Sequence, residues 1–374
     1  MPNYSDLRPE ADFEERDYEV IFPRWKDNVQ KARTIENLLV LREGLRNKVA
    51  AKRADRNLLI ASWNIKEFGH TKQRLPEAYF YIAEILSSFD LIAIQEIKSS
   101  LKDLNTLMQL LGKDWGFIIN DMTEGKDGNF ERSAYILNRK RVDFAGLAGE
   151  IVLWDDLTKD SPIKQLKRTP YITGFTSGWK TFAIVNLHLH PGSGEEDIQL
   201  RKEEVRLLLT AIHEKTSRGH FWNDNLILSG DFNLYAGDDK DNPTIEMINT
   251  MGFEEVESLK GVDTNASKTE SFDRLFLTSN KYFTIAKDEK GVDVGGVFDP
   301  YEIVFKEGQE EQYRTFMLDQ YTGDKDTNEP DFLPKYFKHP WRKNQLSDHF
   351  PIWFELLIDS SDEFLQGKLT SFKP

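Results

Sequence analysis

Strand-length apolar runs alternate with helix-like stretches along most of this chain. The apolar runs occur within residues 58–69, 90–98, 131–137, 182–191, 226–233, 272–277 and 347–356. Between some of them, at 76–89 and 196–215, apolar residues recur every three or four positions, which is typical of amphipathic helices. Helical crossovers join parallel neighbouring strands, so the pattern predicts an α/β domain with a partly parallel sheet.

The N-terminal 56 residues have a different pattern. Between Trp25 and Val49, charged residues separate apolar residues that recur mostly every three or four positions. The apolar positions are Trp25, Val29, Ala32, Ile35, Leu38, Leu39, Leu45 and Val49. This pattern predicts an amphipathic helix, which either packs on the rest of the chain or serves as an arm for self-association or for another protein.

These patterns divide the chain into three parts. We predict a helical extension at 1–56, a main domain at 57–358 and a C-terminal tail at 359–374. Within the main domain, residues 281–346 are rich in Gly, Pro and Asp, and are predicted to be a loop-rich insertion. A segment of this kind either decorates the fold or helps to select a substrate.

Polar residues stand where the apolar runs begin or end. Those at the carboxyl ends of their runs are Asn64, Glu96, His188 and Asp231, and those that precede theirs are Asp273 and His349. All six reach one edge only if the last strands run opposite to the first ones. We therefore predict two mixed β-sheets packed face to face and covered by helices outside, a four-layer α/β/β/α sandwich.

The side chains at this edge are those that bind a metal ion and a phosphate. Glu96 is the best candidate ligand, because hard divalent cations prefer carboxylate oxygens. Asn64 adds an amide oxygen, and Asp231 and Asn233 lie two residues apart after a buried strand. Glu96 alone is equally consistent with a surface ion pair, and Asp231 and Asn233 alone with an ordinary turn. Together they indicate a metal-dependent site.

Two histidines complete the set. His188 and His349 can each take or give a proton near neutral pH. A lone histidine at a strand end is more often structural, but both of these have a plausible orienting carboxylate. The combination favours a nuclease or a phosphatase.

Composition limits the other function classes. The chain of 374 residues has 63 acidic and 49 basic residues, a net charge of −14, so its whole surface is not suited to bind nucleic acid. A local cleft with a metal and a few cations can still do so. The chain has no cysteine, no membrane-length apolar run and no signal-peptide pattern, which predicts a cytoplasmic protein.

Six motifs match a known family together. WNIKEFG, IQEI, NLHLHP, SGDFN, FDRLFL and SDHFP occur in this order between about Leu58 and Ile358. They resemble the endonuclease/exonuclease/phosphatase superfamily, and within it they look most like deoxyribonuclease I. The resemblance implies a Mg²⁺ site, with Mn²⁺ or Ca²⁺ as alternatives, formed by Glu96, Asn64 and Asp348. It also implies that the scissile phosphate is bound by Arg168, Asn233 and Asn64.

The resemblance assigns roles to the histidines as well. It implies that His188 pairs with Glu131 and His349 with Asp273, and that Asp231 and Asn233 contact the metal or the phosphate. One histidine would then activate water while the other protonates the leaving oxygen. Which histidine does which is open at this point.

The expected activity is Mg²⁺-dependent endonucleolytic cleavage of DNA to 5′-phosphate and 3′-hydroxyl ends. One alternative is a phosphodiesterase or phosphatase for a lipid or small-molecule phosphoester. Others are a non-catalytic module on the same fold, and an enzyme held inactive until a partner recruits it. The chain also departs from deoxyribonuclease I. Where that family inserts a Tyr and an Arg into the minor groove, this chain has Asn129, followed by Phe130, and Lys98.

Overall fold

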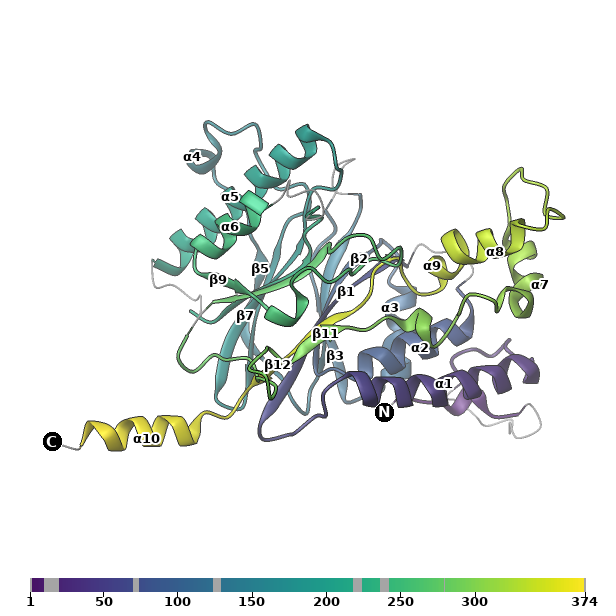
Figure 1. The fold of residues 1–374 in the computed structure, drawn as a ribbon, viewed down its shortest axis with the longest axis horizontal. Helices are drawn as coiled ribbons and strands as arrows, with labels where there is room; N and C mark the ends of the chain where they lie inside the picture. Colours follow the sequence, from purple (N-terminus) through teal and green to yellow (C-terminus); the bar gives the residue numbers. More distant parts are fainter. Residues whose placement is uncertain are drawn as a thin grey trace.

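The computed structural model describes residues 2–9, 20–69, 74–123, 129–217, 224–235, 242–278 and 280–372. Within these residues, two six-stranded mixed sheets form the centre of the molecule (Figure 1). In spatial order, the first sheet contains β11 (Gly295–Val297), β12 (Ile352–Leu357), β1 (Asn57–Phe68), β2 (Leu91–Ile97), β4 (Arg132–Asn138) and β3 (Trp115–Ile119). The second contains β5 (Asp143–Glu150), β6 (Tyr171–Ser177), β7 (Lys180–His188), β8 (Leu226–Asp231), β10 (Asp273–Thr278) and β9 (Phe253–Glu255).

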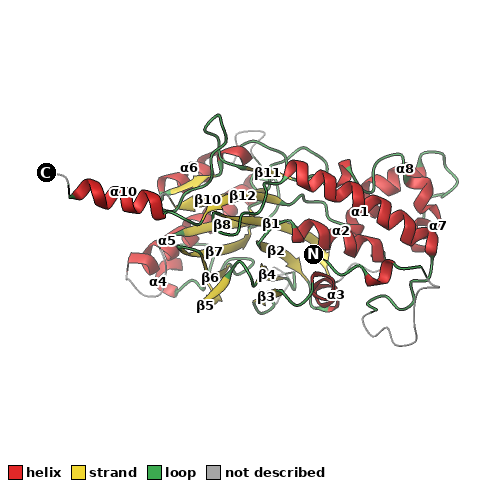
Figure 2. Ribbon diagram, turned by 90° about the horizontal axis from the view of Figure 1, so that it is seen from below, coloured by secondary structure: helices red, strands yellow, loops and turns green. Residues whose placement is uncertain are grey.

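Helices cover the outer faces of the two sheets (Figure 2). Those associated with the first sheet are α1 (Asn28–Lys48), α2 (Pro76–Ser87), α3 (Lys102–Leu111), α7 (Glu310–Gln320), α8 (Phe332–Tyr336) and α9 (Arg342–Gln345). The second sheet carries α4 (Asp155–Thr158), α5 (Glu195–Ser217) and α6 (Asn242–Thr250). Short helical turns lie at Ser5–Leu7, Glu257–Leu259, Pro300–Glu302 and Phe337–Trp341, and α10 (Ser361–Ser371) ends the described chain.

The alternation of side chains along β1 shows how the layers form. Leu58 and Ile60 point into the core between the two sheets, whereas Leu59, Ala61 and Trp63 point into the core under α1 and α2. Successive side chains of a strand face opposite sides, so a strand that is apolar at every position belongs to a sheet buried on both faces. A third core lies between the second sheet and α5 and α6. The predicted four-layer sandwich is therefore confirmed.

The strand directions also agree with the prediction. β1 pairs in parallel with β2, and β7 with β8, whereas β12 runs antiparallel to β1 and β10 antiparallel to β8. The carboxyl ends of β1, β2, β7 and β8 therefore lie at the same edge as the amino ends of β10 and β12.

Helix α1 packs on the domain through a face that only partly matches the predicted one. Asp27 caps it by accepting hydrogen bonds from the backbone N–H groups of the next turn. Leu38, Leu41 and Leu45 are buried, while Val29 and Leu39 are exposed. Ala32 and Ile35 are exposed as well, so the predicted apolar face was wrong at four positions. The buried face of α1 includes the polar residues Lys31 and Thr34. The exposed apolar positions therefore made the predicted face differ from the buried one.

A buried polar cluster joins α1 to two other helices. The Arg33 guanidinium on α1 lies 2.6 Å from the Glu77 carboxylate on α2 and 4.5 Å from the ring centre of Tyr313 on α7. The Tyr81 hydroxyl donates to the same carboxylate at 3.1 Å. The N-terminal helix, the main domain and the 281–346 segment therefore share one polar junction as well as one apolar core.

The 281–346 segment is more regular than its composition predicts. It contains β11, α7, α8 and α9. In α7, acidic residues occupy the first turn, and Tyr313 and Met317, four positions apart, are buried. An apolar pair on a single helical face is a weak signal among many charges, so the sequence suggested loops. Among the described residues, no helix combines the length and apolar character needed to cross a membrane.

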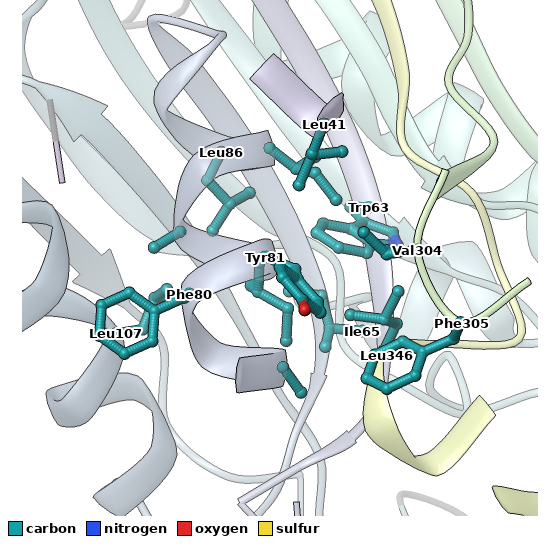
Figure 3. Packing of buried hydrophobic residues seen from close by; sticks show 14 of the residues in the cluster. Leu41, Trp63, Ile65, Phe80, Tyr81, Leu86, Leu107, Val304, Phe305 and Leu346 are labelled. Atoms are coloured by element: carbon teal, nitrogen blue, oxygen red, sulfur yellow. The ribbon is translucent and has the colours of Figure 1, made fainter. Parts of the chain in front are cut away.

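We expect Leu41→Ala to lower the free energy of unfolding by about 2–5 kcal/mol, because Leu41 is fully buried beside Trp63 and Tyr81 (Figure 3). The matched control is Leu39→Ala on the same helix, where the side chain is 61% exposed and a change within about 0.5 kcal/mol is expected. Urea denaturation followed by circular dichroism measures both. Equal effects would mean that α1 does not pack as described.

Candidate active site

The polar residues predicted from the strand ends meet at one edge of the sandwich. The first sheet contributes Asn64 (β1), Glu96 (β2), Glu131 (before β4) and His349 (before β12), and the second contributes Arg168 (before β6), His188 (β7), Asp231 (β8) and Asp273 (β10). Their contacts cross from one sheet to the other.

His349 is held by a buried carboxylate. Its Nδ1 lies 2.7 Å from Oδ2 of Asp273. The Thr264 hydroxyl donates to the same oxygen at 2.8 Å and accepts the backbone N–H of Asp273 at 3.0 Å. Burial alone would lower the pKa of His349, but Asp273 and Asp231 outweigh it and raise this pKa well above its usual value. The ring therefore favours the imidazolium form at neutral pH.

His188 also has a buried carboxylate beside its Nδ1, in an ion-pair contact across the two sheets. Its Nδ1 lies 2.9 Å from Oε2 of Glu131, and Nε of Arg168 lies 2.8 Å from that oxygen. The second oxygen, Oε1, is 3.0 Å from Nζ of Lys98 and accepts a hydrogen bond of 2.5 Å from the Asn129 amide. Burial alone would raise the pKa of Glu131, but His188, Arg168 and Lys98 lower it well below its usual range. Glu131 is therefore an anion across the physiological pH range.

Asp231 lies between the two rings. Its Oδ2 is 3.5 Å from Nε2 of His188 and 3.7 Å from Nε2 of His349. The same oxygen accepts a hydrogen bond of 3.0 Å from the Asn64 amide. Both imidazoles thus keep Nδ1 on an orienting carboxylate and turn Nε2 toward a common point.

Two oxygens near this point fit a divalent cation. The Asn64 amide nitrogen donates to Glu96 and to Asp231, both at 3.0 Å. Its side-chain oxygen, Oδ1, is buried and has no hydrogen-bond partner among the residues that the structure describes. The Glu96 carboxylate accepts from Asn64 and from the backbone N–H of Glu67, and retains further lone pairs. An unpartnered buried oxygen beside a carboxylate suits a hard cation, which prefers oxygen ligands.

Other groupings fit a cation less well. Ligand atoms of Glu96, Glu131 and His188 lie within 4.8 Å of one another, but Glu131 already has four donors around it. Asp348, the third predicted ligand, has its Oδ2 3.3 Å from Nζ of Lys66. The structure thus brings Glu96 and Asn64 together and pairs Asp348 with a lysine at the rim.

The candidate phosphate-binding residues share one backbone carbonyl. The oxygen of Leu189 accepts hydrogen bonds from Arg168 at 3.3 Å and from the Asn233 amide at 3.1 Å. Asn233 and Glu96 both have left-handed backbones, with φ of 51° and 61°. Such strained conformations in non-glycine residues concentrate at functional sites. Gly230 is required nearby, because a Cβ there would lie 2.0 Å from the Leu187 carbonyl oxygen.

Three supporting residues were not predicted. Thr264 binds Asp273 as described. The Ser347 hydroxyl donates to the backbone carbonyl of Asn64 at 2.6 Å and accepts the backbone N–H of His349 at 3.1 Å. On α5, the buried carboxylate of Glu204 accepts the backbone N–H groups of Lys167 at 3.0 Å and His190 at 2.8 Å. The first two lie in loops and the third in a helix, so the strand-end pattern gave no signal for them.

Over part of its length, the chain is similar in sequence to known deoxyribonucleases. No family model matches the chain. Human deoxyribonuclease-1 is 27% identical over 186 residues, which are 47% of this chain and 61% of that protein. Rat deoxyribonuclease gamma is 26% identical over 188 residues, 47% of this chain and 56% of that protein. The chain thus matches about three fifths of the length of these curated relatives.

An endonuclease/exonuclease/phosphatase family protein from Bacteroides thetaiotaomicron has a solved structure that superposes with a TM-score of 0.49 and 18% identity, covering 82% of this chain and 99% of the other. The predicted resemblance to the endonuclease/exonuclease/phosphatase superfamily is confirmed by the sequence matches. Within that superfamily, those matches are to deoxyribonucleases.

We expect Glu204→Ala to destabilise the protein by about 1–3 kcal/mol, because it leaves two backbone N–H groups without their buried acceptor. The control is the neighbouring Glu203→Ala, which removes a partly exposed ion pair with Arg206 and a side-chain contact with Ser161, and should cost less than about 1 kcal/mol. Thermal unfolding of both variants measures the difference. Indistinguishable melting curves would contradict this role of Glu204.

Proposed function

We propose that the protein is a divalent-metal-dependent phosphodiesterase that cleaves DNA endonucleolytically, leaving 5′-phosphate and 3′-hydroxyl ends. The arrangement of the two histidines around Asp231 carries this proposal. Each ring is oriented through Nδ1 by a buried carboxylate and presents Nε2 to a shared space. Hydrolysis of a phosphodiester needs one group that takes a proton from water and one that gives a proton to the leaving oxygen.

The proton roles follow from the surroundings of each ring. His349 lies between Asp273 and Asp231, which raise its pKa and favour the imidazolium that a general acid needs. His188 then serves as the base toward water, with Glu131 holding its Nδ1–H and stabilising the imidazolium that forms. Asp231 faces both Nε2 atoms and fixes the Asn64 amide.

The remaining residues bind the phosphate and the metal. Arg168 and Asn233, oriented by the Leu189 carbonyl, would contact non-bridging phosphate oxygens. Glu96 and Asn64 would hold a cation such as Mg²⁺, and Asp348 would join them from the rim if it leaves Lys66. When bound, the cation neutralises charge that develops on the phosphate.

A second candidate is a phosphodiesterase or phosphatase for a small or lipid phosphoester. The observation that favours it is the buried position of Lys98. This lysine forms an ion pair with Glu131 and does not present its charge to a DNA groove. The net charge of −14 points the same way, because a large polyanion is repelled by most of the surface. Inositol phosphates, sphingomyelin and bis-p-nitrophenyl phosphate, assayed beside DNA, separate the two functions.

Supercoiled plasmid should be nicked in Mg²⁺ and left intact in EDTA. His188→Ala and His349→Ala should each lower the nicking rate by about 10²- to 10⁴-fold, since each removes one proton-transfer group. His213→Ala, on α5 and away from these contacts, is the control and should retain the wild-type rate. A rate within threefold of wild type for either site variant would falsify the assignment.

The leaving group distinguishes the two histidines. Bis-p-nitrophenyl phosphate releases p-nitrophenolate, a leaving group that needs little protonation. The fold loss of rate caused by His349→Ala should therefore be at least about tenfold smaller on this substrate than on DNA. His188→Ala should lose similar activity on both substrates, because water must be activated in either case. The opposite pattern would exchange the two roles.

A further inference from the structure

Lys98 is a buried lysine beside the site with no role in the mechanism above. It follows β2, two residues after Glu96, and only 7% of it is exposed. Its Nζ lies 3.0 Å from Oε1 of Glu131 and donates to the Asn129 carbonyl at 3.3 Å. Its backbone N–H donates to the Phe68 carbonyl at 2.8 Å, which ties the lysine to the end of β1.

The donors around Glu131 divide between its two oxygens. Lys98 and Asn129 contact Oε1, whereas Arg168 and His188 contact Oε2. A partial rotation of the carboxylate plane would move Oε2 out of the position that contacts His188. A cation fixed by the backbone on the Oε1 side opposes this rotation.

Lys98 also balances charge during the reaction. Arg168 serves two anions in the proposed site, the Glu131 carboxylate and the substrate phosphate. When Arg168 binds the phosphate, its charge is shared between two anions. Lys98 then remains as the cation that neutralises Glu131. The ionised carboxylate can then continue to hold Nδ1–H of His188.

We infer that Lys98 is a positioning residue that holds Glu131 in the rotamer that orients His188, and that it does not contact the substrate. This inference rests on the proposed function and deepens it. It has a consequence for specificity, because a lysine committed to Glu131 gives the enzyme no cation at this position for reading a DNA groove.

The test is a double-mutant cycle with Lys98→Met, Glu131→Gln and the double variant, assayed on a fluorescent oligodeoxynucleotide in Mg²⁺. Lys98→Met should lower kcat about 10- to 100-fold with KM changed less than threefold, and should cause no further loss in the Glu131→Gln background. Lys98→Arg should restore most of kcat. Lys102→Met, an exposed lysine at the start of α3, is the matched control. A raised KM with unchanged kcat, or a full additional loss in the double variant, would identify a substrate contact and overturn the inference.

An NMR measurement tests the same inference independently of activity. Long-range ¹H–¹⁵N spectra of His188 should show a single Nδ1-protonated form in the wild type and in Lys98→Arg, and a tautomer mixture in Lys98→Met. An unchanged His188 tautomer in Lys98→Met would overturn the inference even if the wild type cleaved none of the phosphoesters. That absence of cleavage would separately refute the proposed function.

Discussion

The site depends on the two sheets being held in register, because each histidine lies on one sheet and its orienting carboxylate on the other. His188 belongs to the second sheet and Glu131 to the first, while His349 belongs to the first and Asp273 to the second. Beneath them, the buried amide of Gln95 on β2 donates to Asn186 on β7 at 2.7 Å, and Asn186 donates to the backbone of β2 and β4. Buried amides that lose their hydrogen-bond partners destabilise the fold, so these hydrogen bonds of Gln95 and Asn186 favour one register between the sheets.

Such an arrangement suits a reaction that needs two proton-transfer groups at once. The rings are positioned by rigid strand ends, and the flexible part of each side chain is restrained by a buried carboxylate. Strained backbones at Glu96 and Asn233 occur in the same place, where strand pairing and hydrogen bonds can hold them. The strain at these positions lowers stability locally, and three apolar cores offset it, one between the sheets and one on the outer face of each sheet.

Much of this could be predicted from the sequence, for a definite reason. Polar residues at the ends of apolar runs are easy to recognise in a sequence. Asp273 and His349 can reach the same edge as Asp231 only if the sheets are mixed, which predicts the strand directions. Residues that support the site by holding another side chain or the nearby backbone could not be predicted from the sequence. Thr264 lies nine residues before Asp273 and Glu204 lies in a helix, so only the folded chain brings them to the site. The buried face of α1 was partly misassigned, because exposed apolar residues such as Val29 and Leu39 belong to a second series with helical spacing, offset from the buried leucines.

The junction between Arg33, Glu77 and Tyr313 has a consequence for how this chain could have evolved. Glu77 is buried on α2, its counter-ion comes from the N-terminal helix, and the ring that covers this counter-ion comes from α7. Loss of the N-terminal helix alone would strand a buried carboxylate, and loss of α7 alone would uncover the guanidinium. The two helices therefore depend on each other, and a change that removes one is expected to be tolerated only together with loss of the other.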